Sequence, residues 1–236
     1  MKFRFIKPLI FFSHQMDNDK TVIPVYNKIA KAYADAFSKP SDYMEEFLEL
    51  LPENGKVLDI GCGVGVDSAY AQTKGFKVVG VDMSEKMLKI ARSNNSSVDF
   101  RLEDVRSIEF RENEFDGIIA SCSLIHIPKE EVPKMLKRLS LFLKPNGKIY
   151  ISLQAGESKE IFIDEPFKPD EKLFLNIFSF DEIKKLLIDE GFEITHRHER
   201  KAEKKEELDF TKLYIIAVKK SAHRNIAEHG ISGSEN

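Results

Sequence analysis

A short glycine-rich segment in the first third of the chain restricts the possible folds more than any other feature. Residues 56–60 form an apolar run typical of a buried β-strand, and Gly61, Gly63 and Gly65 follow at alternate positions. A helical pattern over residues 66–74 begins directly after the third glycine. In open α/β sheets, a glycine turn between strand and helix lets the backbone approach a nucleotide-like ligand. The segment therefore predicts a βα unit whose strand ends at a ligand site.

The same alternation of short apolar runs and helical patterns continues through the middle of the chain. Further strands are predicted at residues 77–81, 98–102, 115–120 and 148–153, and helices at residues 85–93 and 130–143. Several of the strands are almost continuously apolar, as expected where helices cover both faces of a sheet. The pattern predicts a parallel sheet built from βαβ units.

Helices precede this sheet, and a helix and two strands follow it. The helices are predicted at residues 25–37, 42–51 and 179–190, and the strands at residues 192–197 and 212–218. The charged stretch 199–209 between the last two strands is short, so these two strands must be antiparallel. We therefore expect an α/β fold, a three-layer α/β/α sandwich around a seven-stranded, mostly parallel sheet whose last strand is antiparallel.

The length of 236 residues suits one such domain, which we place at residues 21–220. Residues 1–20 are expected to be a flexible extension, with translation from Met16 as an alternative. Its apolar run is interrupted at Lys7 and Pro8, which disfavours a secretory signal or membrane anchor. Residues 221–236 are polar and without pattern, and are expected to be disordered.

Composition limits the partners. A formal net charge of −3 argues against a broad nucleic-acid surface, and no apolar stretch is long enough for a membrane helix. Cys62 and Cys122 have no metal-ligand spacing and are expected to be reduced thiols in a cytoplasmic protein. Nothing in the sequence indicates an oligomeric state.

Acidic residues near the glycines indicate which ligand the loop holds. A dinucleotide loop would have a third glycine at the position of Val66. Asp59, at the head of the loop, is unfavourable beside phosphates but suits a ligand with an ammonium and a sulfonium. Asp82 ends the next predicted strand, 21 residues after Gly61, a spacing that suits hydrogen bonds from ribose hydroxyls. These residues favour a ribose-containing ligand, and the glycine spacing and Asp59 favour one that is not a dinucleotide.

Polar residues also follow the third and fourth predicted strands. Asp104 could accept a hydrogen bond from the exocyclic amine of adenine, and the Val105 N–H could serve a ring nitrogen. Ser121 and His126 follow the fourth strand, where an acceptor would meet the ligand. His126 is the candidate general base, because its ordinary pKa suits removal of a proton. Two alternatives stay open, a role as pocket wall and no role in the site.

These elements, in this order, resemble the class I (Rossmann-like) S-adenosylmethionine-dependent methyltransferases, in particular their small-molecule branch, from about residue 25 to residue 220. The resemblance implies S-adenosylmethionine as cofactor and S-adenosylhomocysteine as product. It also implies that Asp82 binds the ribose, that Asp104 and Val105 bind adenine, and that the glycines and Ser121 lie near the methionine part. The expected cofactor-binding set is Tyr33, Asp59, Gly61, Cys62, Gly63, Asp82, Met83, Asp104, Val105 and Ser121.

Missing motifs narrow the reaction. No Asn-Pro-Pro-Tyr-like run follows the fourth strand, and Cys122 is not part of a Pro-Cys pair, which disfavours methylation of DNA bases. His196 and His198 have no third ligand nearby, so no metal site is expected. We expect in-line methyl transfer to an oxygen, nitrogen or carbon atom of a small molecule. An RNA or protein methyltransferase, an NAD-dependent oxidoreductase and a non-catalytic cofactor-binding module remain as alternatives.

The acceptor itself is not indicated by any motif. We expect its site to involve the leading helices and the insert at residues 154–178, which contains two apolar runs and is predicted to be a hairpin covering the site. Phe162 and Phe178 are candidate pocket walls, with simple packing as the alternative. A nucleic-acid or protein acceptor would be favoured if the fold gathered basic residues at the pocket mouth. The candidates are Lys28, Lys31, Lys39 and Lys168.

Overall fold

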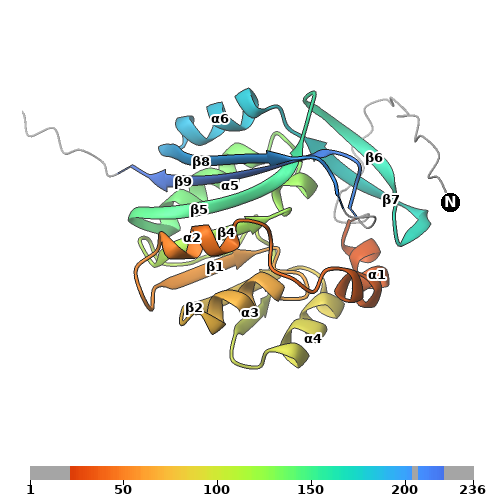
Figure 1. Cartoon of the computed structure of the whole chain (residues 1–236), viewed down its shortest axis with the longest axis horizontal. Helices are drawn as coiled ribbons and strands as arrows, with labels where there is room; N and C mark the ends of the chain where they lie inside the picture. The colour runs from red at the N-terminus through yellow and green to blue at the C-terminus, as the bar shows by residue number, and fades with distance from the viewer. Residues whose placement is uncertain (1–21, 204–206, 221–236) are drawn as a thin grey trace, which may run out of the picture.

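The structure, a computed structural model, describes residues 22–203 and 207–220 (Figure 1). The expectations of a flexible extension at residues 1–20, a start at Met16 and a disordered tail at residues 221–236 lie outside the described residues.

One seven-stranded sheet forms the centre of the molecule. Its strands run in the order β3 (Asp99–Leu102), β2 (Lys77–Asp82), β1 (Lys56–Ile60), β4 (Phe115–Ser121), β5 (Leu143–Ala155), β9 (Thr211–Lys219) and β8 (Phe192–Arg200). The first five strands in this order pair in parallel, whereas β9 is antiparallel to both of its neighbours. The predicted mostly parallel sheet with a reversed last strand is therefore confirmed.

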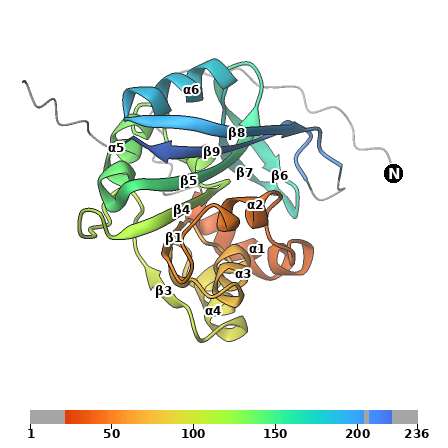
Figure 2. The same cartoon turned by 60° about the vertical axis from the view of Figure 1, so that its left-hand side comes forward.

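Helices cover both faces of the sheet, which confirms the three-layer arrangement (Figure 2). One face carries α2 (Met44–Glu49), α3 (Val66–Thr73) and α4 (Glu85–Asn94), and the other carries α5 (Val132–Phe142) and α6 (Phe180–Asp189). Neighbouring residues of β1 show why both layers are needed. Val57 packs with α2 and α3, Leu58 packs with α5, and both are 0% exposed. A strand that is apolar on both sides must be covered on both sides.

The remaining elements lie at the edge of the sheet where the parallel strands end. They are α1 (Val22–Ala36), the short 3₁₀ helix η2 (Leu124–His126), and the strands β6 (Lys159–Glu165) and β7 (Lys168–Ile177). The insert forms the hairpin that the sequence predicts, because β6 and β7 pair antiparallel. β7 contacts α1 and η2, so the hairpin and the leading helix close over the same edge (Figure 1).

The predicted start of β5 and the predicted end of β8 are wrong. β5 begins at Leu143 instead of residue 148, because Leu143 already pairs with Phe115 before the turn at Asn146 and Gly147 interrupts the register. β8 extends to Arg200 and shortens the charged loop that the sequence predicts. Its charged residues are compatible with a strand because β8 lies at the edge of the sheet, where one side of the strand has no neighbour.

The packing of α5 allows a test of the fold. Leu136 is 0% exposed between the sheet and this helix, whereas Leu141 of the same helix is 44% exposed. Replacing Leu136 by Ala should lower the free energy of unfolding by about 2–5 kcal/mol, through lost apolar burial and the cavity left behind. Leu141→Ala is the matched control and should cost less than about 1 kcal/mol. Equal losses in urea denaturation of the two variants would contradict this placement of the helix.

Candidate functional site

The glycine loop is held in a conformation that favours glycine at three positions, the third being Gly65 with a φ angle of +79°. Gly61 and Gly63 have φ angles of +65° and +54°, in the left-handed region. A Cβ at Gly61 would lie 2.7 Å from the Cβ of Ser123, whereas a Cβ at Gly63 would meet nothing within 4 Å. Gly61 therefore allows the loop to pack against the end of β4. Gly63 leaves an open stretch of backbone that a ligand can approach.

Two connected cavities lie around this loop. The first, which we call the loop pocket, has a volume of about 140 Å³ and is lined by Gly61, Gly63, Asp82, Met83, Val105 and Ser121, among others. The second, the hairpin cavity, has a volume of about 220 Å³ and extends from the loop to the β6–β7 hairpin and the β8–β9 loop. The linings of both cavities include Tyr26, Tyr33, Gly61, Gly63, Ser121, Cys122 and His126. These shared residues mark the place where a ligand in one cavity meets a ligand in the other.

Asp82 connects the loop to the end of β2. Its Oδ2 accepts a hydrogen bond from the Gly63 N–H at 2.8 Å, and its Oδ1 accepts one from the Ser84 N–H at 2.7 Å. Burial raises the pKa of this carboxyl above its ordinary value, while these backbone hydrogen bonds oppose the shift. Asp82 and Met83 both line the loop pocket, where the sequence analysis expects them.

The structure brings Val105, but not Asp104, into the lining of the loop pocket. The Asp104 carboxylate accepts hydrogen bonds from Arg106, at 3.0 Å from Nε to Oδ1 and 2.7 Å from Nη2 to Oδ2. Although its partial burial acts to raise the pKa of Asp104, these bonds hold the pKa below its ordinary value. Arg106 lines the loop pocket in its place, and the sequence analysis did not single it out.

Two buried carboxyls line the hairpin cavity near the glycine loop. Asp59 is 2% exposed and accepts a hydrogen bond from Ser68 Oγ at 2.6 Å. Asp67, which the sequence analysis missed, accepts bonds from the N–H and Oγ of Ser41, both at 2.7 Å. Burial raises the pKa of both carboxyls. Asp67 lies in the first turn of α3, where an acidic residue is common, so nothing in the sequence sets it apart.

A chain of hydroxyls continues from Asp67 to the strand ends. Ser41 Oγ lies 2.7 Å from Ser121 Oγ, which lies 3.1 Å from Ser152 Oγ. Ser152 Oγ in turn accepts a hydrogen bond from the Cys122 N–H at 3.0 Å. The predicted site residue Ser121 thus joins the loop before α2 to the ends of β4 and β5. Cys62 and Cys122 are both free thiols, and both line the hairpin cavity.

His126 lies between the two cavities and is hydrogen-bonded on both ring nitrogens. Its Nδ1 is 3.0 Å from the Phe174 carbonyl oxygen, and its Nε2 is 2.7 Å from Tyr26 Oη. A carbonyl oxygen only accepts, so Nδ1 carries the proton and Nε2 of the neutral ring accepts from the Tyr26 hydroxyl. Burial lowers the pKa of His126 to about 4, so the ring is neutral at pH 7.

Tyr26 is the functional candidate that the sequence analysis missed most clearly. It lies two helical turns before Tyr33 on α1, and the two ring centroids are 6.0 Å apart. The spacing of seven residues places both rings on one face of the helix, so this signal was available in the sequence. The partner His126 is 100 positions away, and only the folded chain brings the two together.

The hairpin supplies different wall residues from those expected. Phe162 is 40% exposed and contacts Phe174, and Phe178 is 0% exposed in the core. Neither belongs to the lining of the hairpin cavity, which instead includes Phe167, Leu173 and Leu175.

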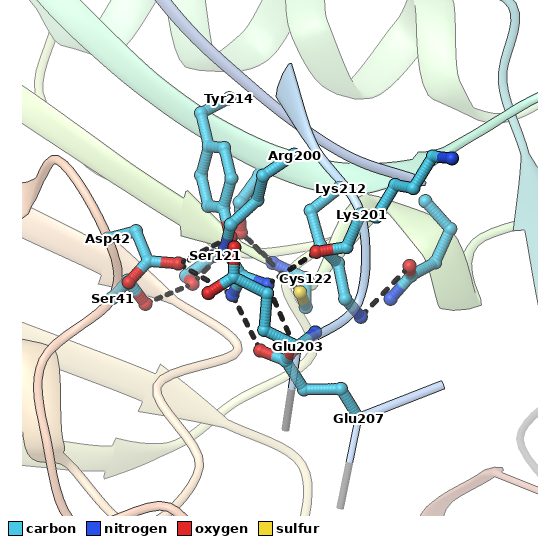
Figure 3. A network of polar contacts seen from close by, with 12 residues as sticks. Ser41, Asp42, Ser121, Cys122, Arg200, Lys201, Glu203, Glu207, Lys212 and Tyr214 are labelled. Carbon is cyan, nitrogen blue, oxygen red and sulfur yellow. Dashed lines mark hydrogen bonds and ion pairs between the residues drawn. The ribbon is translucent and has the colours of Figure 1, made fainter. Parts of the chain in front are cut away.

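Figure 3 shows a network of charged and polar groups, of which Asp42, Arg200, Glu207 and Tyr214 line the hairpin cavity. Arg200, at the end of β8, donates to Asp42 Oδ2 at 2.7 Å and to both carboxylate oxygens of Glu207 at 2.6 and 2.8 Å. Tyr214 Oη also donates to Asp42 Oδ2, at 2.8 Å. Arg200 thus connects the segment between α1 and α2 to the β8–β9 loop.

Three of the four lysines proposed to mark a nucleic-acid surface are paired with carboxylates. Lys28, Lys31 and Lys168 form ion pairs with Glu171, Asp35 and Asp170, respectively. Lys39 is the member of the four that appears in the lining of the hairpin cavity.

Within residues 22–203 and 207–220, no group of three or more His, Cys, Asp and Glu side chains has an arrangement that could hold a metal ion. In the same part of the chain, no helix is both long and apolar enough to span a membrane.

The buried histidine should leave a signature in the pH dependence of stability. Its pKa is about 4 in the folded protein and about 6.5 in an unfolded chain. Between these values the unfolded state binds more protons, so stability should fall as the pH drops from 6.5 towards 4. The loss attributable to His126 should reach about 2–3 kcal/mol.

Urea denaturation at pH 7 and at pH 4.5 checks this, with His126→Gln as the comparison. The buried carboxyls Asp59 and Asp67 are present in both proteins, so their contribution cancels in the difference. The variant should lose less stability than the parent on acidification. The same loss in both proteins would show that His126 is not held in its neutral form.

Comparison with known proteins agrees with this geometry. Residues 57–147 match the family model described as a methyltransferase domain. A Bacillus subtilis protein named as a methyltransferase, YqeM, is 31% identical over 156 residues, which are 63% of this chain and 63% of YqeM. The phosphoethanolamine N-methyltransferase of Plasmodium falciparum is 34% identical over 119 residues, which are 49% of this chain and 45% of that enzyme. The chain thus spans less than two thirds of the length of these relatives.

Solved structures share the fold at lower identity. An S-adenosylmethionine-dependent methyltransferase from Methanosarcina mazei superposes with a TM-score of 0.68 at 22% identity, covering 77% of this chain and 99% of that one. The 1,6-didemethyltoxoflavin-N1-methyltransferase of Burkholderia thailandensis, with its substrate and S-adenosylhomocysteine bound, gives 0.64 at 20% identity, covering 84% and 85%. The sheet order and these matches show that the chain has the Rossmann-like fold of these solved methyltransferases, and that residues 57–147 are similar to the methyltransferase domain family.

Proposed function

We propose that the chain binds S-adenosylmethionine in the loop pocket and transfers its methyl group to an oxygen, nitrogen or carbon atom of a small molecule in the hairpin cavity. The observation that carries this proposal is the junction of the two cavities, lined by Tyr26, Tyr33, Ser121, Cys122 and His126. A donor on one side and an acceptor on the other would meet at this junction. The product left in the loop pocket would be S-adenosylhomocysteine.

The residues present fit this cofactor. Asp82 offers a carboxylate to the ribose, and the open backbone at Gly63 accepts close approach of the ligand. Met83 and Val105 give the pocket apolar walls for adenine. At the junction, Gly61, Cys62, Tyr33 and Ser121 surround the space for the methionine part. The buried carboxyl of Asp59 lies at the head of the loop, on the side where the cofactor's amino group would be.

The bound cofactor supplies a methyl group that is already activated by its sulfonium. The task of the chain is therefore to position the acceptor in line and to exclude water. Positioning alone can lower such a barrier by about 7–11 kcal/mol. The hairpin wall of Phe167, Leu173 and Leu175 and the leading helix α1 restrict the acceptor to one side of the junction.

Tyr26 and His126 together provide a route for the acceptor's proton. The Tyr26 hydroxyl donates to His126 Nε2, which leaves the lone pairs of Tyr26 Oη to accept from an acceptor O–H or N–H. As the methyl group arrives, that proton passes to Tyr26 Oη while the tyrosine proton passes to His126 Nε2. The low pKa of His126 means that the resulting imidazolium gives up its proton readily to solvent.

A small acceptor fits the charge distribution better than RNA. Three of the four lysines that could have marked a phosphate-binding surface form ion pairs with carboxylates, and the net charge is −3. One relative, the 18S rRNA (guanine-N(7))-methyltransferase of fission yeast, is 26% identical over 213 residues. Several other relatives are phosphoethanolamine methyltransferases, which makes phosphoethanolamine the first acceptor to test.

We place this activity in a reducing compartment such as the cytoplasm. Both Cys62 and Cys122 are free thiols, and both line the hairpin cavity. An oxidising compartment would expose thiols at an active site to modification.

Calorimetric titration tests the cofactor. S-adenosylmethionine and S-adenosylhomocysteine should bind, and NADH should not. Asp82→Asn should weaken binding of S-adenosylhomocysteine by about 1–3 kcal/mol, because the ribose hydroxyls lose a charged acceptor. Asp189→Asn, a change of the same kind on α6, is the control and should leave the affinity unchanged. Binding of NADH alone would overturn the proposal.

Turnover tests the role of the Tyr26–His126 pair. Production of S-adenosylhomocysteine should be measured with phosphoethanolamine and with a panel of small amines, phenols and acids. Tyr26→Phe and His126→Gln should both lower kcat by roughly 10²-fold, within the range of general acid–base effects, with cofactor affinity nearly unchanged. The double variant should be no slower than either single one, since both residues serve one proton path. Additive losses would mean that the two side chains act independently.

A further inference from the structure

The hairpin cavity contains a buried lysine, Lys212, that forms no ion pair with a carboxylate within residues 22–203 and 207–220. Lys212 is 8% exposed, and its Nζ donates a hydrogen bond to Gln154 Oε1 at 3.0 Å. Among the described residues, no carboxylate forms an ion pair with this amine. The side chains of Lys212 and Gln154 both line the hairpin cavity.

The neighbouring cation, Arg200, is paired with carboxylates. Arg200 has two carboxylate partners, Asp42 and Glu207, which take up its donors at 2.6–2.8 Å. It has little capacity left for a ligand. The contrast is informative because Arg200 and Lys212 are paired positions on β8 and β9, and Lys212 is also paired with Gln154 on β5.

The cost of burying the Lys212 ammonium is only partly offset by its surroundings. It has three N–H donors, and its hydrogen-bond acceptor among the described residues is the neutral Oε1 of Gln154. Burial lowers the pKa of Lys212, and Arg200 also acts to lower it, while Cys122, Glu207 and Asp42 act to raise it. A buried charge is tolerated when it is paired, so an anion bound in the cavity would supply a counter-charge for Lys212.

The separation between Lys212 and the junction of the two cavities limits the length of an acceptor that could contact both. Gln154 lies two residues beyond Ser152 on β5, and Ser152 bonds to both Ser121 and Cys122 at the junction. Lys212 and Gln154 therefore line the same cavity as Tyr26 and His126, from the side of the paired strands β5 and β9. A small molecule with an acid group at one end could reach the junction with the other.

We propose that the methyl acceptor carries an acid group, a carboxylate or a phosphate, and that Lys212, oriented by Gln154, binds this group and so determines which acceptors are methylated. This rests on the proposed function for the identity of the reaction. The acid group occupies the free donors of Lys212, while the nucleophilic atom lies beside Tyr26.

Anion binding can be tested without knowing the acceptor. The full-length protein, saturated with S-adenosylhomocysteine, is titrated at constant ionic strength with inorganic phosphate, with acetate and with tetramethylammonium, and binding is followed by calorimetry and by the melting temperature. Phosphate, acetate or both should bind and raise the melting temperature, and tetramethylammonium should not. The two anions distinguish a phosphate site from a carboxylate site.

Four variants assign the binding to Lys212. Lys212→Met should weaken anion binding at least tenfold, and Lys212→Arg should retain most of it because the charge stays. Lys77→Met removes the same charge from an exposed position at the start of β2 and should have no effect. Gln154→Leu provides a second test that keeps the lysine, and should weaken anion binding by removing the group that orients it.

The outcomes separate the two proposals. Failure of S-adenosylhomocysteine to bind the parent protein would refute the proposed function. Normal cofactor binding, with anion binding absent or equal in Lys212→Met and Lys77→Met, would refute the acid-binding role alone. Preferential binding of tetramethylammonium would instead indicate a cationic acceptor. With an acceptor in hand, Lys212→Met should raise KM at least tenfold for the acid and leave KM for its uncharged ester or amide unchanged.

Discussion

The hydrogen bond from the Gly63 N–H to Asp82 Oδ2 joins the turn after β1 to the end of β2. The site depends on this contact because it holds a glycine loop with three left-handed residues, Gly61, Gly63 and Gly65, against a carboxylate that lines the loop pocket. Parallel pairing of β1 with β2 and β4 brings all three strand ends to one edge. The loop, Asp82 and Ser121 then lie around one pocket although they are up to 60 positions apart.

Burial gives the site its electrostatic character. It raises the pKa values of Asp59 and Asp67 and lowers that of His126, so charged forms are disfavoured throughout the region until a ligand supplies a counter-charge. In such surroundings, a positively charged cofactor beside the carboxyls and an anion beside Lys212 each gain more than they would at the surface. The same burial explains why Arg200 needs two carboxylates to remain in the cavity wall.

Local sequence patterns predicted the parts of the fold and site that depend on nearby residues. The strand, the glycine turn and the helix after it, and the acidic residue that ends β2, all follow from short-range rules, and the structure has them where expected. Tyr26 and Lys212 were missed because their roles depend on partners 100 and 58 positions away. Phe162 was a poor choice of wall because strand alternation alone did not reveal which side of the hairpin faces the cavity.

Local sequence patterns predict the cofactor side of the site and miss most of the acceptor side. The matched methyltransferase segment, residues 57–147, contains Gly61, Asp82, Val105 and Ser121, which surround the loop pocket. The acceptor side is made largely from outside it, by α1, the β6–β7 hairpin and the ends of β8 and β9. A chain can therefore keep its cofactor site while those outer elements change, and relatives matched mainly through this segment constrain the donor much more than the acceptor. The outer elements therefore determine the acceptor. Among them, the buried ammonium of Lys212 favours a particular chemical group, an anion, most specifically.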